Sequence, residues 1–124
     1  MKRCRLNIES DLQKAIIRWA GMCSRNQHKE LELLYAIPNG ANVSEINRMR
    51  LVSEGMKKGM PDLCLPVAKG KYGSLFIELK TPKGTLTKDQ KEIHVRLEHW
   101  GNCVVVVRNL FQAIDAIEGY LRQG

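Results

Sequence analysis

The sequence lacks long apolar runs. No segment approaches the length of a membrane-spanning helix, and the basic N-terminus, MKRCRLNIESDL, contains no continuous apolar stretch of the kind found in signal peptides. Membrane insertion and secretion are therefore disfavoured, and we expect a cytoplasmic protein of a bacterium or a phage-infected host cell. Repeats, low-complexity tracts and linkers are absent too. The 124 residues are thus predicted to form one domain, residues 1–124, large enough to bury a core without disulfides.

The residue spacing typical of zinc sites or disulfide frameworks is also missing. The cysteines are dispersed, without a CxxC pair or histidines at finger-like spacing. We expect all four to be free thiols in a reducing compartment: Cys4, Cys23, Cys64 and Cys103. The histidines lie among charged residues and are expected at the surface rather than on a metal: His28, His94 and His99.

Acidic residues are scarce relative to basic ones. Lysine and arginine number 20 against 13 aspartates and glutamates, which gives a formal net charge of +7. This excess favours a polyanionic partner, because clustered cations supply the sequence-independent part of nucleic-acid affinity. Charge alone also fits a basic protein without such a partner. The remaining composition, 44% hydrophobic and 27% charged, is typical of an ordinary soluble globular protein.

Hydrophobic periodicity predicts helices and strands in the first half of the chain. An amphipathic helix is expected over residues 7–22, capped by Asn7 and ended by Gly21. The run YAI followed by Pro-Asn-Gly predicts a short strand and a turn. A second helix is expected between Ser44 as its N-cap and Gly55 as its stop.

The second half of the chain predicts a hairpin followed by three more elements. DLCLPV and SLFIELK have strand composition and are joined by the polar loop AKGKYG. The further elements are a helix over KDQKEIHVRLEHWG, a fully buried strand over NCVVVV and a helix over LFQAIDAIEGYLRQ. The order α, β, α, β, β, α, β, α predicts an α/β fold, a small mixed central β-sheet flanked by helices.

The strand predicted within SLFIELK carries opposite charges on one face. Side chains alternate along a strand, so Ile77 and Leu79 point one way while Glu78 and Lys80 point the other. Antiparallel pairing should bring Asp62, which opens the preceding strand, beside Glu78. Two carboxylates about 4 Å apart repel by roughly 4 kcal/mol at an effective dielectric of about 20, a cost that a divalent cation would reverse.

Lys80 would place an ammonium group beside such a metal site. It could orient or help to deprotonate a water molecule, or balance charge on a phosphate. The alternative is a hairpin whose solvent-exposed face happens to carry Glu78 and Lys80. Glu9 lies inside the apolar arc of the first predicted helix, where an unpaired carboxylate would be desolvated at a cost. Either Glu9 is a third acid of the cluster, or the first turn of the helix frays into water.

These segments resemble the PD-(D/E)XK nuclease pattern, and specifically its VRR-NUC branch. The matching segments are GMPDLCL, FIELK and TLTKDQ, which occur in that order before a helix. Glu9 and Gln13 match the acid and the glutamine, one turn apart, of that branch's N-terminal helix, while IPNGAN and TPKG resemble connecting segments. The resemblance extends in order over nearly the whole chain, which makes it specific although each motif is degenerate.

The resemblance implies a restriction-endonuclease-like PD-(D/E)XK core with a metal site. Asp62 and Glu78 are expected to bind Mg²⁺ or Mn²⁺, with the Leu79 carbonyl as a further ligand. Lys80 is expected to position the attacking water. Glu9 is expected to join this cluster.

Gln90 is a further residue that the resemblance implies at the site. The sequence offers a second role for it, because Thr87 and Gln90 form T-x-x-Q, a capping box at a helix start. Both roles can hold at once.

The candidate DNA-contacting residues are cations near the acids. Lys57, Lys58 and Lys83 flank Asp62 and Glu78 in sequence and would meet phosphate oxygens. The resemblance leads us to expect an arginine close after IPNGAN, and the nearest are Arg48 and Arg50, which are further candidates. For each of these residues, the alternative is an ordinary solvated surface.

The predicted function is therefore a metal-dependent DNA endonuclease, a homodimer that cuts branched DNA such as four-way (Holliday) junctions. A two-fold dimer supplies two identical sites for two cuts, and Met49 and Leu51 are candidate interface residues. One alternative is a non-catalytic nucleic-acid-binding module with a decayed nuclease fold. Another is a monomeric flap or single-strand nuclease.

Overall fold

A four-stranded mixed sheet lies at the centre of the computed structural model, which describes residues 8–39 and 43–124. The strands follow one another in the order β1-β2-β3-β4. The β1–β2 and β2–β3 pairs are antiparallel, and the β3–β4 pair is parallel. Their bounds are Tyr35–Ala36 for β1, Leu63–Leu65 for β2, Leu75–Leu79 for β3 and Cys103–Val107 for β4. The predicted hairpin and the predicted α/β class are both confirmed.

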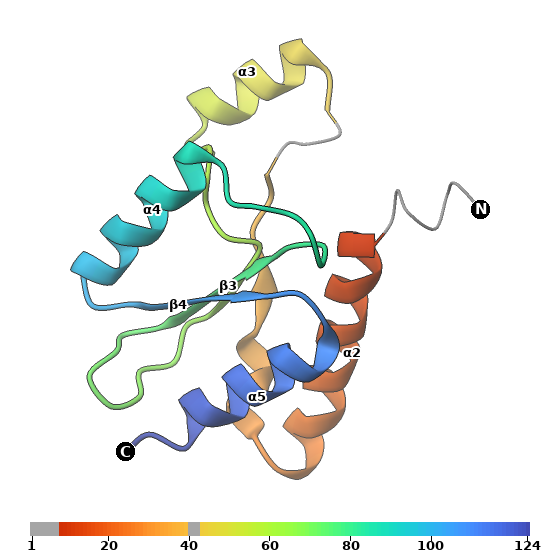
Figure 1. Ribbon diagram of the computed structural model, residues 1–124, viewed down its shortest axis with the longest axis vertical. Helices are drawn as coiled ribbons and strands as arrows, with labels where there is room; N and C mark the ends of the chain where they lie inside the picture. The colour runs from red at the N-terminus through yellow and green to blue at the C-terminus, as the bar shows by residue number, and fades with distance from the viewer. Residues whose placement is uncertain (1–7, 40–42) are drawn as a thin grey trace.

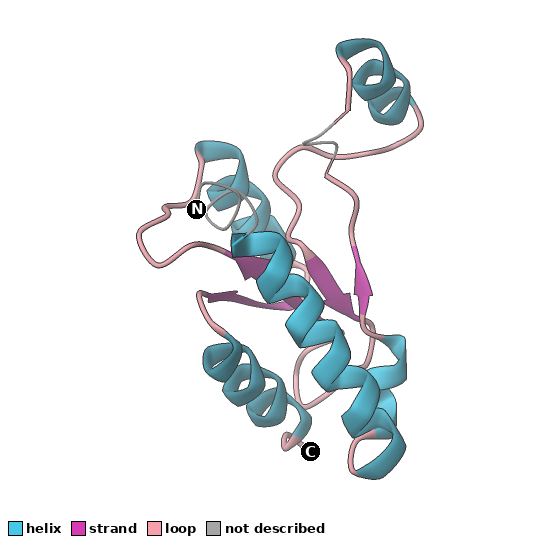
Figure 2. Ribbon diagram, turned by 90° about the vertical axis from the view of Figure 1, so that its right-hand side faces the viewer, coloured by secondary structure: helices cyan, strands magenta, loops and turns pink. Residues whose placement is uncertain are grey.

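Helices cover both faces of this sheet (Figure 1). Helices α2 (Ile8–Asn26) and α5 (Leu110–Leu121) pack together on one face, and α4 (Lys88–His99) lies on the other. Figure 2 shows the long α2 running across the sheet. A 3₁₀ helix, η1 (Lys29–Leu33), connects α2 to β1 and was not predicted. Within the described ranges, no helix is long and apolar enough to cross a membrane.

The core lies between the sheet and the α2–α5 pair. Leu75, Ile77 and Leu79 of β3 are at most 1% exposed, which confirms the predicted apolar face of that strand. The helices meet these residues with buried aliphatic side chains: Ile16, Ala20, Ala113 and Ile117. The other face of β3, which carries Glu78, is therefore left to α4.

The first helix is longer than predicted. It continues through Gly21 to Asn26. Glycine in a helix costs only about 1 kcal/mol relative to alanine, and the packing of Cys23 against the core in the next turn offsets this cost. The predicted cap, Asn7, lies outside the described residues, as does Cys4, whereas Cys23, Cys64 and Cys103 are free thiols as expected.

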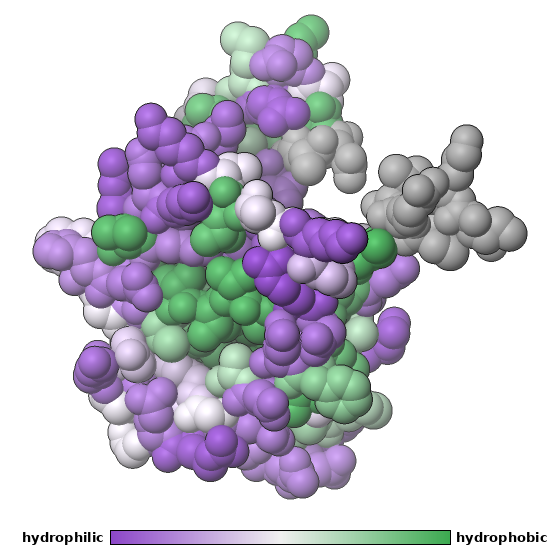
Figure 3. Space-filling view, in the orientation of Figure 1, coloured by the Kyte–Doolittle hydropathy of each residue, from purple (hydrophilic) through white to green (hydrophobic). Residues whose placement is uncertain are grey.

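Strand β4 is not fully buried, contrary to the prediction from NCVVVV. It forms an edge of the sheet, so only its β3 side is paired. Val107 is buried, but Val106 is 36% exposed. Figure 3 shows the resulting patch of apolar side chains where β4 runs between α4 and α5.

Helix α3 (Glu45–Ser53) stands apart from the sheet (Figures 1 and 2). Its start is as predicted, because the Ser44 side chain accepts a hydrogen bond from the Asn47 backbone N–H. Its predicted stop is also confirmed: Gly55 follows the helix with φ of 112°, a conformation that favours glycine. No residue of α3 is buried.

Candidate active site

The hairpin brings the Asp62 side chain against the end of β3. The Asp62 backbone N–H donates to the Ile77 carbonyl at 3.0 Å. One Asp62 carboxylate oxygen, Oδ2, accepts a hydrogen bond from the Leu79 backbone N–H at 2.7 Å. Asp62 is thus fixed from both its backbone and its side chain, next to Glu78.

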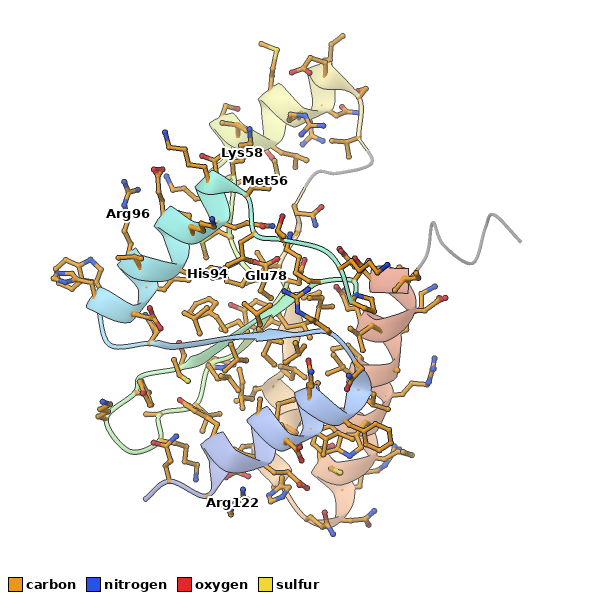
Figure 4. All side chains as sticks on the ribbon, in the orientation of Figure 1. Met56, Lys58, Glu78, His94, Arg96 and Arg122 are labelled. Carbon is orange, nitrogen blue, oxygen red and sulfur yellow. The ribbon has the colours of Figure 1, made fainter. Side chains whose placement is uncertain are left out.

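Glu78 is a buried acid, with only 2% of its surface exposed. Its Oε1 lies 3.0 Å from His94 Nε2, and its Oε2 accepts a hydrogen bond from Gln90 Nε2 at 3.3 Å. Gln90 and His94 are four residues apart on α4 and so lie on one face of the helix. Figure 4 shows His94 of α4 and Glu78 of β3 lying close together between the helix and the sheet. Both oxygens of the carboxyl group are therefore held by α4.

His94 is not a surface residue, and that prediction was wrong. It is 8% exposed, whereas His28 is half-buried and His99 is exposed. The spacing offered a signal: a residue four positions after Gln90 had to face the same way as Gln90, which was already expected near Glu78. His94 is the site residue that the sequence argument missed.

Gln90 has two sets of partners at once. The Thr87 side chain accepts from the Gln90 backbone N–H, and Gln90 Oε1 accepts from the Thr87 backbone N–H at 2.9 Å, which confirms the capping box. This second bond fixes the amide so that its nitrogen points at Glu78. The cap therefore orients the donor that holds the acid.

The pKa of Glu78 is raised to about 8, chiefly because burial disfavours its charged form and also because the Asp62 carboxylate lies nearby. Lys80 opposes the shift and Glu9 adds weakly to it. Burial also lowers the pKa of His94 below its usual range. Without a cation, therefore, Glu78 is largely protonated near neutral pH and His94 is neutral.

Lys80 directly follows β3. Its backbone N–H donates to the Val107 carbonyl at 3.1 Å, and its side chain is half-buried. Its charge acts on Glu78, as the pKa of that acid shows. The strand alternation predicted from FIELK therefore holds up to the end of β3.

Arg108, which the sequence argument did not consider, fixes the turn after Lys80. Its guanidinium Nη1 donates to the carbonyls of Thr81 at 2.8 Å and Gly84 at 2.6 Å. Because Arg108 directly follows β4, the parallel pairing of β3 and β4 places it beside this turn. The turn carries Lys83, which is exposed.

Glu9 lies in the first turn of α2 and is exposed. Its charge reaches Glu78, but within residues 8–39 and 43–124 no three acidic, histidine or cysteine side chains converge as a metal-binding group. The carboxylates brought together are thus Asp62 and Glu78, next to the Leu79 backbone.

This pair of acids has the chemistry of a site for a hard divalent cation. Its donors are carboxylate and carbonyl oxygens, which Mg²⁺ and Mn²⁺ prefer. The Asp62 carboxylate repels negative charge on Glu78. A cation bound by both carboxylates would attract each of them and so offset this repulsion. The residues present could therefore hold such an ion.

The candidate DNA-contacting cations differ in their exposure and in whether they form an ion pair within the chain. Lys57 is exposed, while Lys58 forms an ion pair with Asp89 at 3.4 Å. On α3, Arg50 pairs with Glu54 at 3.2 Å and Arg48 is half-buried. The lysines lie nearer in sequence to the acids than the arginines do.

Gly59 packs the lysine-bearing loop against the start of α4. Its φ is 91°, and a Cβ at this position would lie 2.7 Å from the Asp89 carbonyl oxygen. Only glycine fits there. The loop of residues 56–61 is therefore held against the same helix that holds Glu78.

Comparisons with known proteins agree with this architecture. The family model of the VRR-NUC domain matches residues 3–109. A solved structure described as a VRR_NUC domain protein is 26% identical, with a TM-score of 0.80 over 94% of this chain and 90% of that chain. Among curated protein sequences, none matches the chain.

Proposed function

Because the chain belongs to the VRR-NUC family of nuclease domains, we propose that it is a DNA endonuclease that uses Mg²⁺ or Mn²⁺ to hydrolyse phosphodiester bonds. The observation that carries the proposal is the buried Glu78 carboxyl beside Asp62, with Lys80 two residues further along the chain. A buried acid beside a second, half-buried carboxylate is costly without a cation. Cleavage would leave 5′-phosphate and 3′-hydroxyl ends.

Asp62, Glu78 and the Leu79 carbonyl would hold the metal ion. When bound, a divalent ion stabilises charge developing on the phosphate and makes a bound water more acidic. Gln90 and His94 keep the Glu78 carboxyl in one orientation through their hydrogen bonds to its two oxygens.

Lys80 would orient the attacking water and balance the phosphate charge. Glu9 would support the cluster from the start of α2 through a water molecule. Lys57, Lys58 and Lys83 would bind phosphates on either side of the scissile bond.

The substrate we propose is branched DNA, with the four-way junction as the leading candidate, cut by a homodimer. The described residues bring together one such pair of acids, and resolving a junction needs two related cuts, which a two-fold dimer supplies. The exposed apolar residues of α3 support a dimer: Ile46 is 80% exposed and Met49 is 65% exposed. Leu51, the other candidate interface residue, is half-buried and faces a groove beside Ile37 and Met56.

The test is a panel of labelled single-stranded, nicked, flapped and four-way branched DNA, incubated with Mg²⁺, Mn²⁺ or EDTA. Asp62→Asn, Glu78→Gln and Lys80→Ala should each abolish cleavage while circular dichroism remains native, because charge is lost with little change in the fold. The two acid variants should also lose Mn²⁺ binding, whereas Lys80→Ala should keep it. Full activity in any one of them would remove that residue from the mechanism.

A decayed, non-catalytic binding module is the second candidate. It predicts salt-sensitive DNA binding and no cleavage with any metal. The presence of Asp62, Glu78 and Lys80 together argues against it, since decay would be expected to erase at least one. Cleavage of flaps or single strands by a monomer that spares junctions would instead favour the flap nuclease.

A further inference from the structure

A shallow groove runs along α4 on the side next to the Glu78 contact. Its volume is about 190 Å³, and it is lined by Lys57, Met60, Ile93, Arg96, Leu97 and Trp100. Ile93, Leu97 and Trp100 follow one another at spacings of four and three residues, which puts them on one stripe of the helix. His94 and Gln90 occupy the neighbouring stripe, so the groove and the candidate active site share one helix.

Trp100 is the unusual residue of this groove. It is 80% exposed, although a buried tryptophan would remove roughly 150–250 Å² of surface from water. Its ring is contacted edge-on by His99, with ring centroids 5.0 Å apart and planes at 82°. Most of the indole surface is therefore open to a partner.

Two cations stand at the groove, Lys57 from the loop before Asp62 and Arg96 from α4. Both side chains are exposed, and within the part of the chain that the structure describes neither forms an ion pair. Figure 4 shows Arg96 projecting from α4 away from Glu78. No carboxylate is among the described residues that line the groove.

An aromatic ring flanked by unpaired cations fits single-stranded nucleic acid. The ring offers a stacking surface for a base, and the cations meet the phosphates on either side of it. A protein partner would need acidic groups to match Lys57 and Arg96, whereas DNA supplies negative charge at each nucleotide. Trp100 lies six residues after His94, or about 9 Å along the helix axis, so a strand passing the acids can reach it.

We propose that this groove receives an unpaired nucleobase of the DNA substrate, stacked on Trp100, a contact that rests on the proposed function and extends it. The base would lie against Met60 and Leu97, while Lys57 and Arg96 hold the adjoining phosphates. Such a subsite favours DNA with a melted or single-stranded segment next to the cut. It reads the presence of a base and not its identity, because every base has a stacking face.

The test compares binding of three fluorescein-labelled DNAs in EDTA, so that no metal-dependent cleavage intervenes. They are a single strand, the same strand with abasic sites, and a blunt duplex. The wild type should bind the single strand about tenfold more tightly than the abasic strand. Trp100→Ala should abolish this difference, Trp100→Phe should keep most of it, and duplex binding should change little in either variant.

Phe111→Ala is the matched control, because Phe111 is 79% exposed on α5, on the opposite face of the sheet. Its preference for bases should equal that of the wild type. An undiminished preference in Trp100→Ala would overturn the proposal. The proposal would also be overturned if Trp100→Ala changed the protein from dimer to monomer in light scattering but left DNA binding unaltered. The groove would then be an interface between copies of the chain. Absence of cleavage by the wild type would contradict the nuclease mechanism and leave this binding result standing.

Discussion

Glu78 is subject to two opposite requirements on its protonation state. Its burial disfavours the charged form, yet the proposed metal ion needs a carboxylate there. Hydrogen bonds with Gln90 and His94 satisfy both oxygens of the group in the folded chain. The side chain is therefore held in place before any ion arrives, and ion binding must displace its proton.

The first prediction concerns the stability of the metal-free protein. Glu78 has a pKa of about 8 when folded, above its ordinary value of 4.5, so the folded state retains a proton that the unfolded state has released between these pH values. The free energy of unfolding should therefore fall as pH rises from about 5 to about 8. Urea titrations in EDTA measure this slope, and Glu78→Gln should remove most of it. An identical slope in wild type and variant would show that Glu78 ionises normally.

The second prediction concerns His94 as the residue that positions Glu78. His94→Leu should lower Mn²⁺ affinity and cleavage about 10- to 100-fold, because one Glu78 oxygen loses its partner. His94→Gln, which can still form a hydrogen bond with Glu78, should recover part of both. Calorimetric Mn²⁺ titration measures the affinity without relying on activity.

His99→Gln is the control for His94, since His99 is exposed on the same helix. Its Mn²⁺ affinity should equal that of the wild type. If His94→Leu loses thermal stability but binds Mn²⁺ normally, His94 has only a packing role.

The arrangement of Asp62, Glu78 and Lys80 could be predicted because their relations are local. A strand fixes the common face of Glu78 and Lys80, and a hairpin fixes the approach of Asp62. The contact between His94 and Glu78 joins a helix to a strand 16 residues earlier, and its geometry depends on how α4 docks on the sheet. Charged neighbours made His94 look like a surface residue, and only packing reveals its burial.

At the scale of elements, α4 connects the parts of the site. Its first turn is fixed by the capping box, its inner face holds Glu78, and its start contacts Gly59 of the loop before Asp62. A change in the docking of this one helix would therefore affect both the acids and the lysines.

The third prediction tests the contact between this loop and α4. Gly59→Ala should destabilise the protein by about 1–3 kcal/mol, because alanine is strained at this φ and its Cβ would clash with the Asp89 carbonyl. DNA binding should weaken as well, since Lys57 and Lys58 move with the loop. Thermal melting and fluorescence anisotropy measure the two effects. Gly21→Ala, where an added Cβ meets no atom within 4 Å, is the control and should be neutral or stabilising.

The elements whose limits were predicted wrongly depend on tertiary packing. Helix α2 passes Gly21 because later residues such as Cys23 still reach the core, which a local stop signal does not reveal. The apolar run of β4 predicted complete burial, but the run is the same for a central and an edge strand, and the order of strands decides which it is. Start signals such as Ser44 and Thr87 succeeded because capping involves only neighbouring residues.

At the scale of the whole molecule, α3 stands apart from the sheet (Figures 1 and 2). An isolated helix shorter than about 12 residues is marginal in water, yet this one spans only Glu45–Ser53 and buries none of its residues. Ile46, Met49 and Val52 are more than half exposed and lie within one arc of the helix. A second copy of the chain that covers this arc would stabilise α3 and bring two sets of acids into one assembly.

The last prediction is that Met49→Lys converts a homodimer into a monomer with intact chemistry. An ammonium at the centre of the apolar arc would be desolvated on association, whereas in the monomer it remains in water. Light scattering should show the change in mass. A supercoiled plasmid bearing a four-way junction should be linearised by the wild type, because paired sites cut both strands in one encounter. Met49→Lys should only nick the same plasmid.

Val106→Lys, on the exposed edge strand β4, is the comparison variant. If Val106→Lys separates the subunits and Met49→Lys does not, the interface follows that edge of the sheet. If the wild type is a monomer that does not cleave junctions, the proposal of a dimeric junction resolvase is wrong. Metal-dependent cleavage of other DNA would still support the nuclease mechanism.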